Sequence, residues 1–178
     1  DPVEQGFRRG GQVADRVAGC FQRLQHVEQR GRHVEIVGPD ILAARRMVPN
    51  RSGVIMTVTA AHSREGLPLV GGYGPAQAAK EALTRDLSVE LAPQGIRVVG
   101  LRPYAMPETP TIKDAFEPRR EASGMTWEQW QEMLASRTHP RRLMTLEEMA
   151  NVAVFMASDK ASGMTGTTVN LTMGRLSD

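Results

Sequence analysis

Residues 53–103 read GVIMTVTAAHSREGLPLVGGYGPAQAAKEALTRDLSVELAPQGIRVVGLRP, and this stretch predicts a strand, a long helix and a second strand. Its first eight residues are apolar and β-branched, which is typical of a strand buried on both faces of a parallel sheet. The predicted helix runs from about Gly74 to Leu91 and ends at the breaker run APQG. Residues 96–102, IRVVGLR, then form another buried strand. Such a βαβ unit predicts an α/β fold with a parallel sheet.

The remaining elements are predicted by apolar periodicity and by helix-capping residues. Helices are expected at 11–30, 41–47, 113–121, 126–137 and 145–158, and further strands at 33–37 and 167–171. Thr126 is positioned to cap the fourth of these helices. Thr145 is followed three residues later by Glu148, which is the spacing of a capping box.

Composition favours one globular domain. The chain has 178 residues, of which 40% are hydrophobic and 24% charged, and it has no apolar run near the roughly 20 residues of a membrane helix. We therefore expect a cytoplasmic protein that makes no membrane contact. The chain opens on Asp1 without a signal-like segment, which we interpret as a piece of a longer product rather than a secreted precursor.

The numbers and spacing of cysteine, histidine and charged residues give no support for a disulfide, a metal site or a nucleic-acid interface. Cys20 is the sole cysteine, so neither an internal disulfide nor a thiolate metal cluster is expected, and the four histidines show no ligand spacing. Residues 1–51 contain nine arginines, no lysine and six acidic residues. This excess of positive charge is too small to predict nucleic-acid binding, and a solvated helix face is the favoured interpretation.

Three segments together resemble the short-chain dehydrogenase/reductase family. They are SGVIMTVTA at 52–60, YGPAQAAKEALTRDLSVELAPQGIRVVGLRP at 73–103, and RRLMTLEEMANVAVFMASDKASGMTGTTVNL at 141–171. The resemblance implies a Rossmann-like three-layer sandwich around a parallel sheet, truncated at its N-terminal side. On this basis residues 41–178 form the C-terminal part of the domain, and 104–140 form a lid-like insertion. Residues 1–40 form an Arg-rich segment without a family motif.

The resemblance also implies where catalytic residues should lie, and here the sequence departs from the family. Family members use a tyrosine as acid/base, a lysine four residues later, and a serine thirteen residues earlier. Tyr73 occupies the tyrosine position, but Gln77 stands at the lysine position and Ala60 at the serine position. Lys80 and Ser63 are the nearest candidates to replace the missing groups.

The missing lysine matters because of its charge. Lowering a tyrosine pKa from about 10 to about 7 requires roughly 4 kcal/mol. An ammonium about 4 Å away supplies about that much at an effective dielectric constant near 20, whereas a neutral amide supplies about 1 kcal/mol. Lys80 shares a helix face with Tyr73, but its backbone lies about 10 Å from Tyr73 along the helix axis. Its ammonium either reaches back to replace the missing lysine or is simply exposed to solvent. Ser63 in the loop is a substitute hydroxyl or a turn residue.

The family resemblance implies NAD or NADP as cofactor. Gln77 then stands where relatives have the lysine that holds the nicotinamide ribose. Pro103 and Tyr104 would flank the nicotinamide ring, and Thr109 is the candidate to contact its carboxamide. Tyr104 stands where relatives usually have glycine, so its side chain is expected to crowd that approach. The glycine-rich phosphate loop is missing, because RRGGQVADR at 8–16 has the wrong spacing.

Three functions remain open from the sequence. The first is an NAD(P)-dependent oxidoreductase that acts on a small carbonyl or alcohol substrate and is weakly active or inactive. The alternative is a non-catalytic member that forms homo-oligomers through the helix carrying Ala78, Ala82 and Leu83, as relatives do. Nucleic-acid binding through the arginine-rich start has charge alone to support it.

Overall fold

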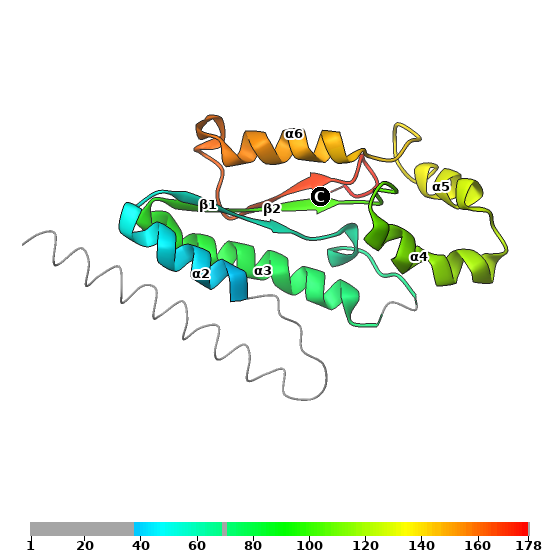
Figure 1. Cartoon of the computed structure of the whole chain (residues 1–178), viewed down its shortest axis with the longest axis horizontal. Helices are drawn as coiled ribbons and strands as arrows, with labels where there is room; N and C mark the ends of the chain where they lie inside the picture. Colours follow the sequence, from blue (N-terminus) through cyan, green and yellow to red (C-terminus); the bar gives the residue numbers. More distant parts are fainter. Residues whose placement is uncertain (1–37, 69–70, 178) are drawn as a thin grey trace, which may run out of the picture.

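The computed structural model of the chain describes residues 38–68 and 71–177. Three strands form its sheet in the order β1-β2-β3, and both pairs are parallel (Figure 1). β1 is Gly53–Val58, β2 is Ile96–Pro103 and β3 is Thr167–Leu171. Ile55 lies opposite Val98 in the first pair, and Leu101 lies opposite Val169 in the second. The predicted parallel βαβ unit is therefore confirmed.

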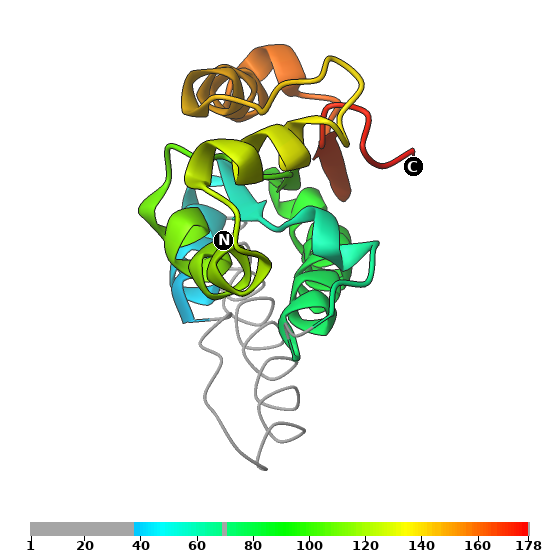
Figure 2. The ribbon, with the colours of Figure 1, turned by 90° about the vertical axis from the view of Figure 1, so that its right-hand side faces the viewer.

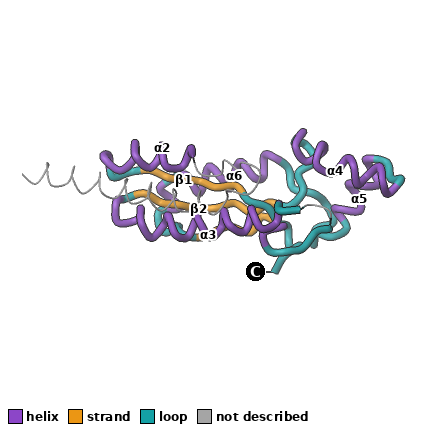
Figure 3. Tube along the Cα trace, turned by 90° about the horizontal axis from the view of Figure 1, so that it is seen from below, coloured by secondary structure: helices purple, strands orange, loops and turns teal. Residues whose placement is uncertain are grey.

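Helices cover both faces of this sheet. α2 (Gly38–Met47) and α3 (Tyr73–Leu91) lie on one face, and α6 (Leu146–Ala157) lies on the other, which gives three layers (Figure 2). α4 (Pro110–Ser123) and α5 (Trp127–Ala135) lie beyond the carboxyl ends of the strands (Figure 3). Four short 3₁₀ turns complete the described elements: η1 (Val48–Asn50), η2 (Ala61–Ser63), η3 (Ala92–Gln94) and η4 (Asp159–Ala161).

β2 is the centre of the core because both of its faces are covered. Val98 belongs to the cluster formed with α2 and α3, which also contains Leu87 and Leu91. The next residue, Val99, belongs to the cluster on the α6 side together with Met156. Successive strand residues point to opposite faces, so a strand between two helical layers must be apolar at consecutive positions. This explains why IRVVGLR shows an apolar run rather than alternation.

Local signals fix the ends of the helices. Thr126 and Thr145 each form a capping box, with Gln129 and Glu148 as the respective partners. After α3, Gly95 adopts φ 77°, and a Cβ there would lie 2.2 Å from the carbonyl oxygen of Arg51. Glycine alone fits this turn, which directs the chain from η3 into β2.

The expected fold class is confirmed, since the described residues form a Rossmann-like α/β structure around a parallel sheet. The predicted helix at 11–30 and strand at 33–37 lie outside the described residues. The insertion at 104–140 contains α4 and α5, and its action as a lid stays a prediction. In the described part of the chain, none of the helices combines the length and apolar character needed to cross a membrane.

Candidate active site

Tyr73 is the first residue of α3, directly after the turn at Gly71 and Gly72. Its side chain is 43% exposed, and its ring meets the His62 imidazole edge-on, with centroids 5.6 Å apart. Burial raises the pKa of Tyr73 above its ordinary value of 10.0. This shift is opposite in direction to the one that a tyrosine acting as acid/base near neutral pH requires.

A cavity of about 280 Å³ adjoins Tyr73 at the carboxyl ends of β1 and β2. Its lining comes from the loop after β1, the start of α3, the end of β2 and helix α4: Ala60, Ala61, His62, Leu67, Tyr73, Pro103, Tyr104, Ala105, Ala115, Phe116 and Arg119. In open α/β sheets ligands bind at this edge of the sheet. The cavity is therefore the candidate reaction cleft.

Lys80 is not brought to Tyr73. Its ammonium donates a hydrogen bond of 2.6 Å to the carbonyl oxygen of Val58, the last residue of β1. Lys80 lies seven residues along α3 from Tyr73, which is about 10 Å along the helix axis, and Val58 offers a nearer acceptor. Gln77, one turn after Tyr73, is not among the residues that line the cavity.

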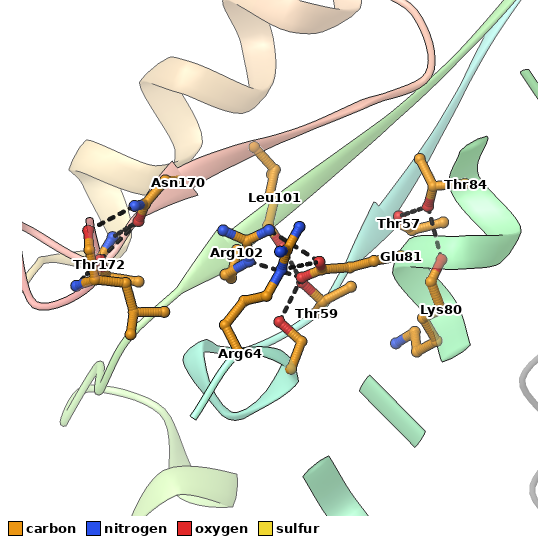
Figure 4. Close-up of polar contacts among 12 residues, drawn as sticks. Thr57, Thr59, Arg64, Lys80, Glu81, Thr84, Leu101, Arg102, Asn170 and Thr172 are labelled. Atoms are coloured by element: carbon orange, nitrogen blue, oxygen red, sulfur yellow. Dashed lines mark hydrogen bonds and ion pairs between the residues drawn. The ribbon is translucent and has the colours of Figure 1, made fainter. Parts of the chain in front are cut away.

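Ser63 lies in the loop after β1, and its side chain is bound to Glu81. Its hydroxyl donates to Oε1 of Glu81 at 2.5 Å. The Thr59 hydroxyl lies 3.2 Å from the same Glu81 oxygen (Figure 4). Ala60 lines the cavity, whereas Thr59 faces Glu81, as expected for neighbours at the end of a strand. Ser63 thus ties the loop that holds His62 to Glu81, and it is not among the residues that line the cavity.

Glu81 is the centre of this anchor. Its carboxylate forms a bidentate pair with Arg102, with Nε–Oε1 at 2.7 Å and Nη2–Oε2 at 2.8 Å, and both side chains are 2–3% exposed. Arg64 adds an Nε–Oε2 contact of 3.3 Å. Burial raises the pKa of Glu81, but hydrogen bonds from Arg102 and Ser63 outweigh it and lower the pKa to about 2. This carboxylate is ionised at neutral pH, and it joins α3, β2 and the loop after β1.

Tyr104 follows β2 and borders the cleft. It is 8% exposed, and the Arg175 guanidinium lies 4.9 Å from its ring centroid. Pro103 also lines the cleft, but Thr109 does not. The Thr109 hydroxyl donates to the carbonyl oxygen of Met106 at 2.8 Å, and Thr109 occupies the N-cap position of α4 without a side-chain capping hydrogen bond. The structure thus brings Tyr73, Pro103 and Tyr104 together and leaves Gln77, Lys80 and Thr109 outside the cavity lining.

His62 was not identified from the sequence, although it contacts Tyr73 and lines the cleft. Burial lowers its pKa from the ordinary 6.5, Glu65 opposes this effect, and Arg119 and Arg175 reinforce it. The lowered pKa favours the neutral imidazole at pH 7, and a neutral imidazole does not carry the positive charge of a lysine. The signal that was available is its position in the loop directly after a buried strand, where parallel sheets place functional residues.

Comparison with known proteins gives the family. The family model described as enoyl-(acyl carrier protein) reductase matches residues 41–175. The chain belongs to the short-chain dehydrogenase/reductase family. Sorbitol-6-phosphate 2-dehydrogenase of Klebsiella pneumoniae is 31% identical over 161 residues, which cover 88% of this chain and 58% of that protein. (+)-Borneol dehydrogenase 2 of Salvia officinalis is 29% identical over 160 residues, which cover 86% and 53%.

A solved relative shares the fold as well as the sequence likeness. The crystal structure of sorbitol-6-phosphate 2-dehydrogenase from Erwinia amylovora has a TM-score of 0.73 and 25% identity, covering 80% of this chain and 57% of that one. This short-chain dehydrogenase/reductase chain thus spans somewhat more than half the length of these relatives. The 88% coverage exceeds what residues 41–178 supply, so that alignment also includes part of residues 1–40, where we identified no family motif.

The described residues fit the nicotinamide cofactor of the family only at its reactive end. The cleft beside Tyr73 has a volume of about 280 Å³, and the side chain of Tyr104 forms part of its wall at the position where the family resemblance implies glycine. No glycine-rich phosphate turn of the G-x-G-x-x-G kind occurs within residues 38–68 or 71–177. The residues that the structure describes therefore do not make a complete dinucleotide site.

Proposed function

We propose that the chain supplies the substrate cleft and the proton-transfer residue of an NAD(P)-dependent short-chain oxidoreductase for carbonyl or alcohol substrates, and that this activity is feeble. Tyr73 carries the proposal because it lines the cleft while the Lys80 ammonium is bound to Val58. Two similar proteins are named as dehydrogenases of sorbitol 6-phosphate and (+)-borneol, which supports an alcohol or its carbonyl product as substrate.

The pH dependence of alcohol oxidation tests this proposal. In that direction Tyr73 must accept a proton, and a phenol with a pKa above 10 is ionised in fewer than about one molecule in a thousand at pH 7. We expect the rate to rise about tenfold per pH unit from pH 7 towards 10, because the ionised fraction rises by that factor. The measurement is the initial rate with NAD or NADP added, over this pH range.

Two controls complete the assay. Tyr73→Phe should abolish the slope, since no other group in the cleft has been assigned this proton. A titration with NADH and NADPH, followed by nicotinamide fluorescence, should show weak but saturable binding. A rate that is already at a plateau near pH 7 would contradict the unactivated tyrosine, and a flat fluorescence signal with both coenzymes would contradict the oxidoreductase.

A non-catalytic, self-associating protein is the second candidate, favoured by the outer face of α3. Val89 on this helix is 76% exposed, and Ala78 is also exposed. If this face joins two copies, sedimentation should give a dimer or larger species, and Val89→Glu should convert it to monomer by placing a charge in an apolar contact. Val154→Glu is the matched control, because Val154 is 70% exposed on α6, on the opposite face of the sheet. A monomeric parent chain would exclude this candidate.

A further inference from the structure

A second cavity, of about 210 Å³, adjoins the reaction cleft. It is bordered by the loop after β1, by α4 and α5, and by the segment after β3. The two cavities share His62, Leu67, Tyr104, Phe116 and Arg119. One extended ligand can therefore place a reacting group beside Tyr73 and its other end in the second cavity.

Positive charge exceeds negative charge around the second cavity. Its lining includes the guanidinium groups of Arg119, Arg137 and Arg175 and the carboxylate of Glu65. Arg175 is paired with Glu65, with Nη2–Oε2 at 2.7 Å and Nε–Oε1 at 3.0 Å. Among the lining residues, no carboxylate remains to balance the other two arginines. Both signs of charge act on His62: burial lowers its pKa, Glu65 raises the pKa, and Arg119 and Arg175 lower it.

Of the two unbalanced guanidinium groups, that of Arg119 is held by a backbone carbonyl oxygen, whereas Arg137 is an exposed residue. Nη2 of Arg119 donates to the carbonyl oxygen of Pro68 at 2.9 Å, which leaves its other N–H groups available to a ligand. Arg137 lies near the Tyr104 phenol: burial raises the pKa of Tyr104, while Arg175 and Arg137 favour its ionised form. Positioned guanidinium groups are the usual partners of carboxylates and phosphates.

Trp130 provides a second, independent observation. It lies on α5, lines the cavity and is 8% exposed. Its Nε1 is buried and has no acceptor among the described residues. An unsatisfied buried donor is costly, and a ligand oxygen in the cavity would remove that cost. The ring of Phe116 lies beside it, with centroids 5.9 Å apart, so the wall around this donor is otherwise apolar.

We propose that the second cavity binds the anionic end, a carboxylate or a phosphate, of the substrate whose carbonyl or hydroxyl lies beside Tyr73. Arg119 and Arg137 supply the charge, and Trp130 supplies a neutral donor. The assignment of the reacting group rests on the proposed oxidoreductase function, whereas anion binding itself does not.

The test is a binding experiment that needs no coenzyme. The sequence contains two tryptophans, so Trp127→Phe leaves Trp130 as the sole indole. This variant is titrated with glycerol 3-phosphate, with glycerate and with glycerol, and its fluorescence is followed. We expect a saturable change with one or both anions and none with glycerol. The two anionic arms distinguish a phosphate site from a carboxylate site.

Substitutions then test the assigned residues. Arg119→Met and Arg137→Met should each weaken anion binding about tenfold or more, as loss of a charge-assisted hydrogen bond predicts. Arg85→Met, an exposed change on α3, should leave the affinity within about twofold. Calorimetry of the parent chain and of Trp130→Phe measures the same binding without fluorescence. The proposal is overturned if neither anion binds, if glycerol binds equally well, or if both arginine variants match the parent.

Discussion

Replacement of Glu81 by glutamine is expected to lower the free energy of unfolding by about 3–5 kcal/mol. The side chain of Arg102 is 2% exposed, and it would lose its bidentate contact with the charged Glu81 carboxylate. Ser63 and Thr59 would also lose charge-assisted bonds to the same group. The measurement is urea unfolding of the parent and the Glu81→Gln variant, read from the midpoint at constant slope.

Two further variants separate a broken ion pair from general damage to α3. Asp86→Asn changes an exposed carboxylate on the same helix and should alter stability by no more than about 0.5 kcal/mol. Glu81→Met combined with Arg102→Met should recover part of the loss, since apolar residues can replace a buried pair. If Glu81→Gln is as stable as the parent, the buried pair does not anchor the loop.

The buried Glu81–Arg102 pair also determines how the stability of the protein changes at low pH. The pKa of Glu81 is lowered from 4.5 to about 2, so its stabilising contribution is complete above pH 4.5 and is lost as the pH falls towards 2. The stability difference between the parent and Glu81→Gln should therefore shrink across this interval. A difference that stays constant between pH 5 and pH 2 would contradict the shifted pKa.

Restoring the charge at position 77 is expected to have the largest effect on chemistry. Gln77→Lys places an ammonium one helical turn after Tyr73, where side chains at i and i+4 are neighbours. A cation at this range should lower the pKa of Tyr73 by about 1–3 units. Because the sequence has two tyrosines, the titration is made in a Tyr104→Phe background, in which near-ultraviolet absorbance reports Tyr73 alone.

Activity provides the second measurement for this variant. A lower pKa enlarges the ionised fraction at pH 7, so the rate of alcohol oxidation there should rise about tenfold per unit of pKa shift. Gln77→Met is the control, because it fills similar volume without charge and should leave both quantities unchanged. A parent Tyr73 that already titrates near pH 7 would refute our view that the site is unactivated.

The secondary structure was predictable because its signals are local. The capping boxes at Thr126 and Thr145 and the breaker run that ends at Gly95 each mark an element end within a few residues of sequence. The parallel sheet also followed from residues 53–103, since two apolar strands joined by a long helix have few other solutions. Bounds shifted slightly: the helix predicted at 113–121 spans Pro110–Ser123, because Pro110 is favoured in a first helical turn.

The candidate site was predictable in part. Counting along the helix identified Tyr73 and the missing charge at Gln77, because residues four apart share a face whatever surrounds them. What Lys80 and Ser63 bind was not predictable in this way. Their partners, Val58 and Glu81, are 22 and 18 residues away in the chain and were brought near by packing.

The sequence by itself determined the family, the parallel sheet and the neutral side chain of Gln77 one helical turn after Tyr73, since each depends on residue order over short spacings. The tertiary structure alone decided that Glu81 and Arg102 form a buried pair, that His62 meets Tyr73, and that Arg119, Arg137 and Trp130 border one cavity. These groups come from separate elements of the fold. Their charges and donors act on one another over a few ångströms of space, and linear spacing does not encode that proximity.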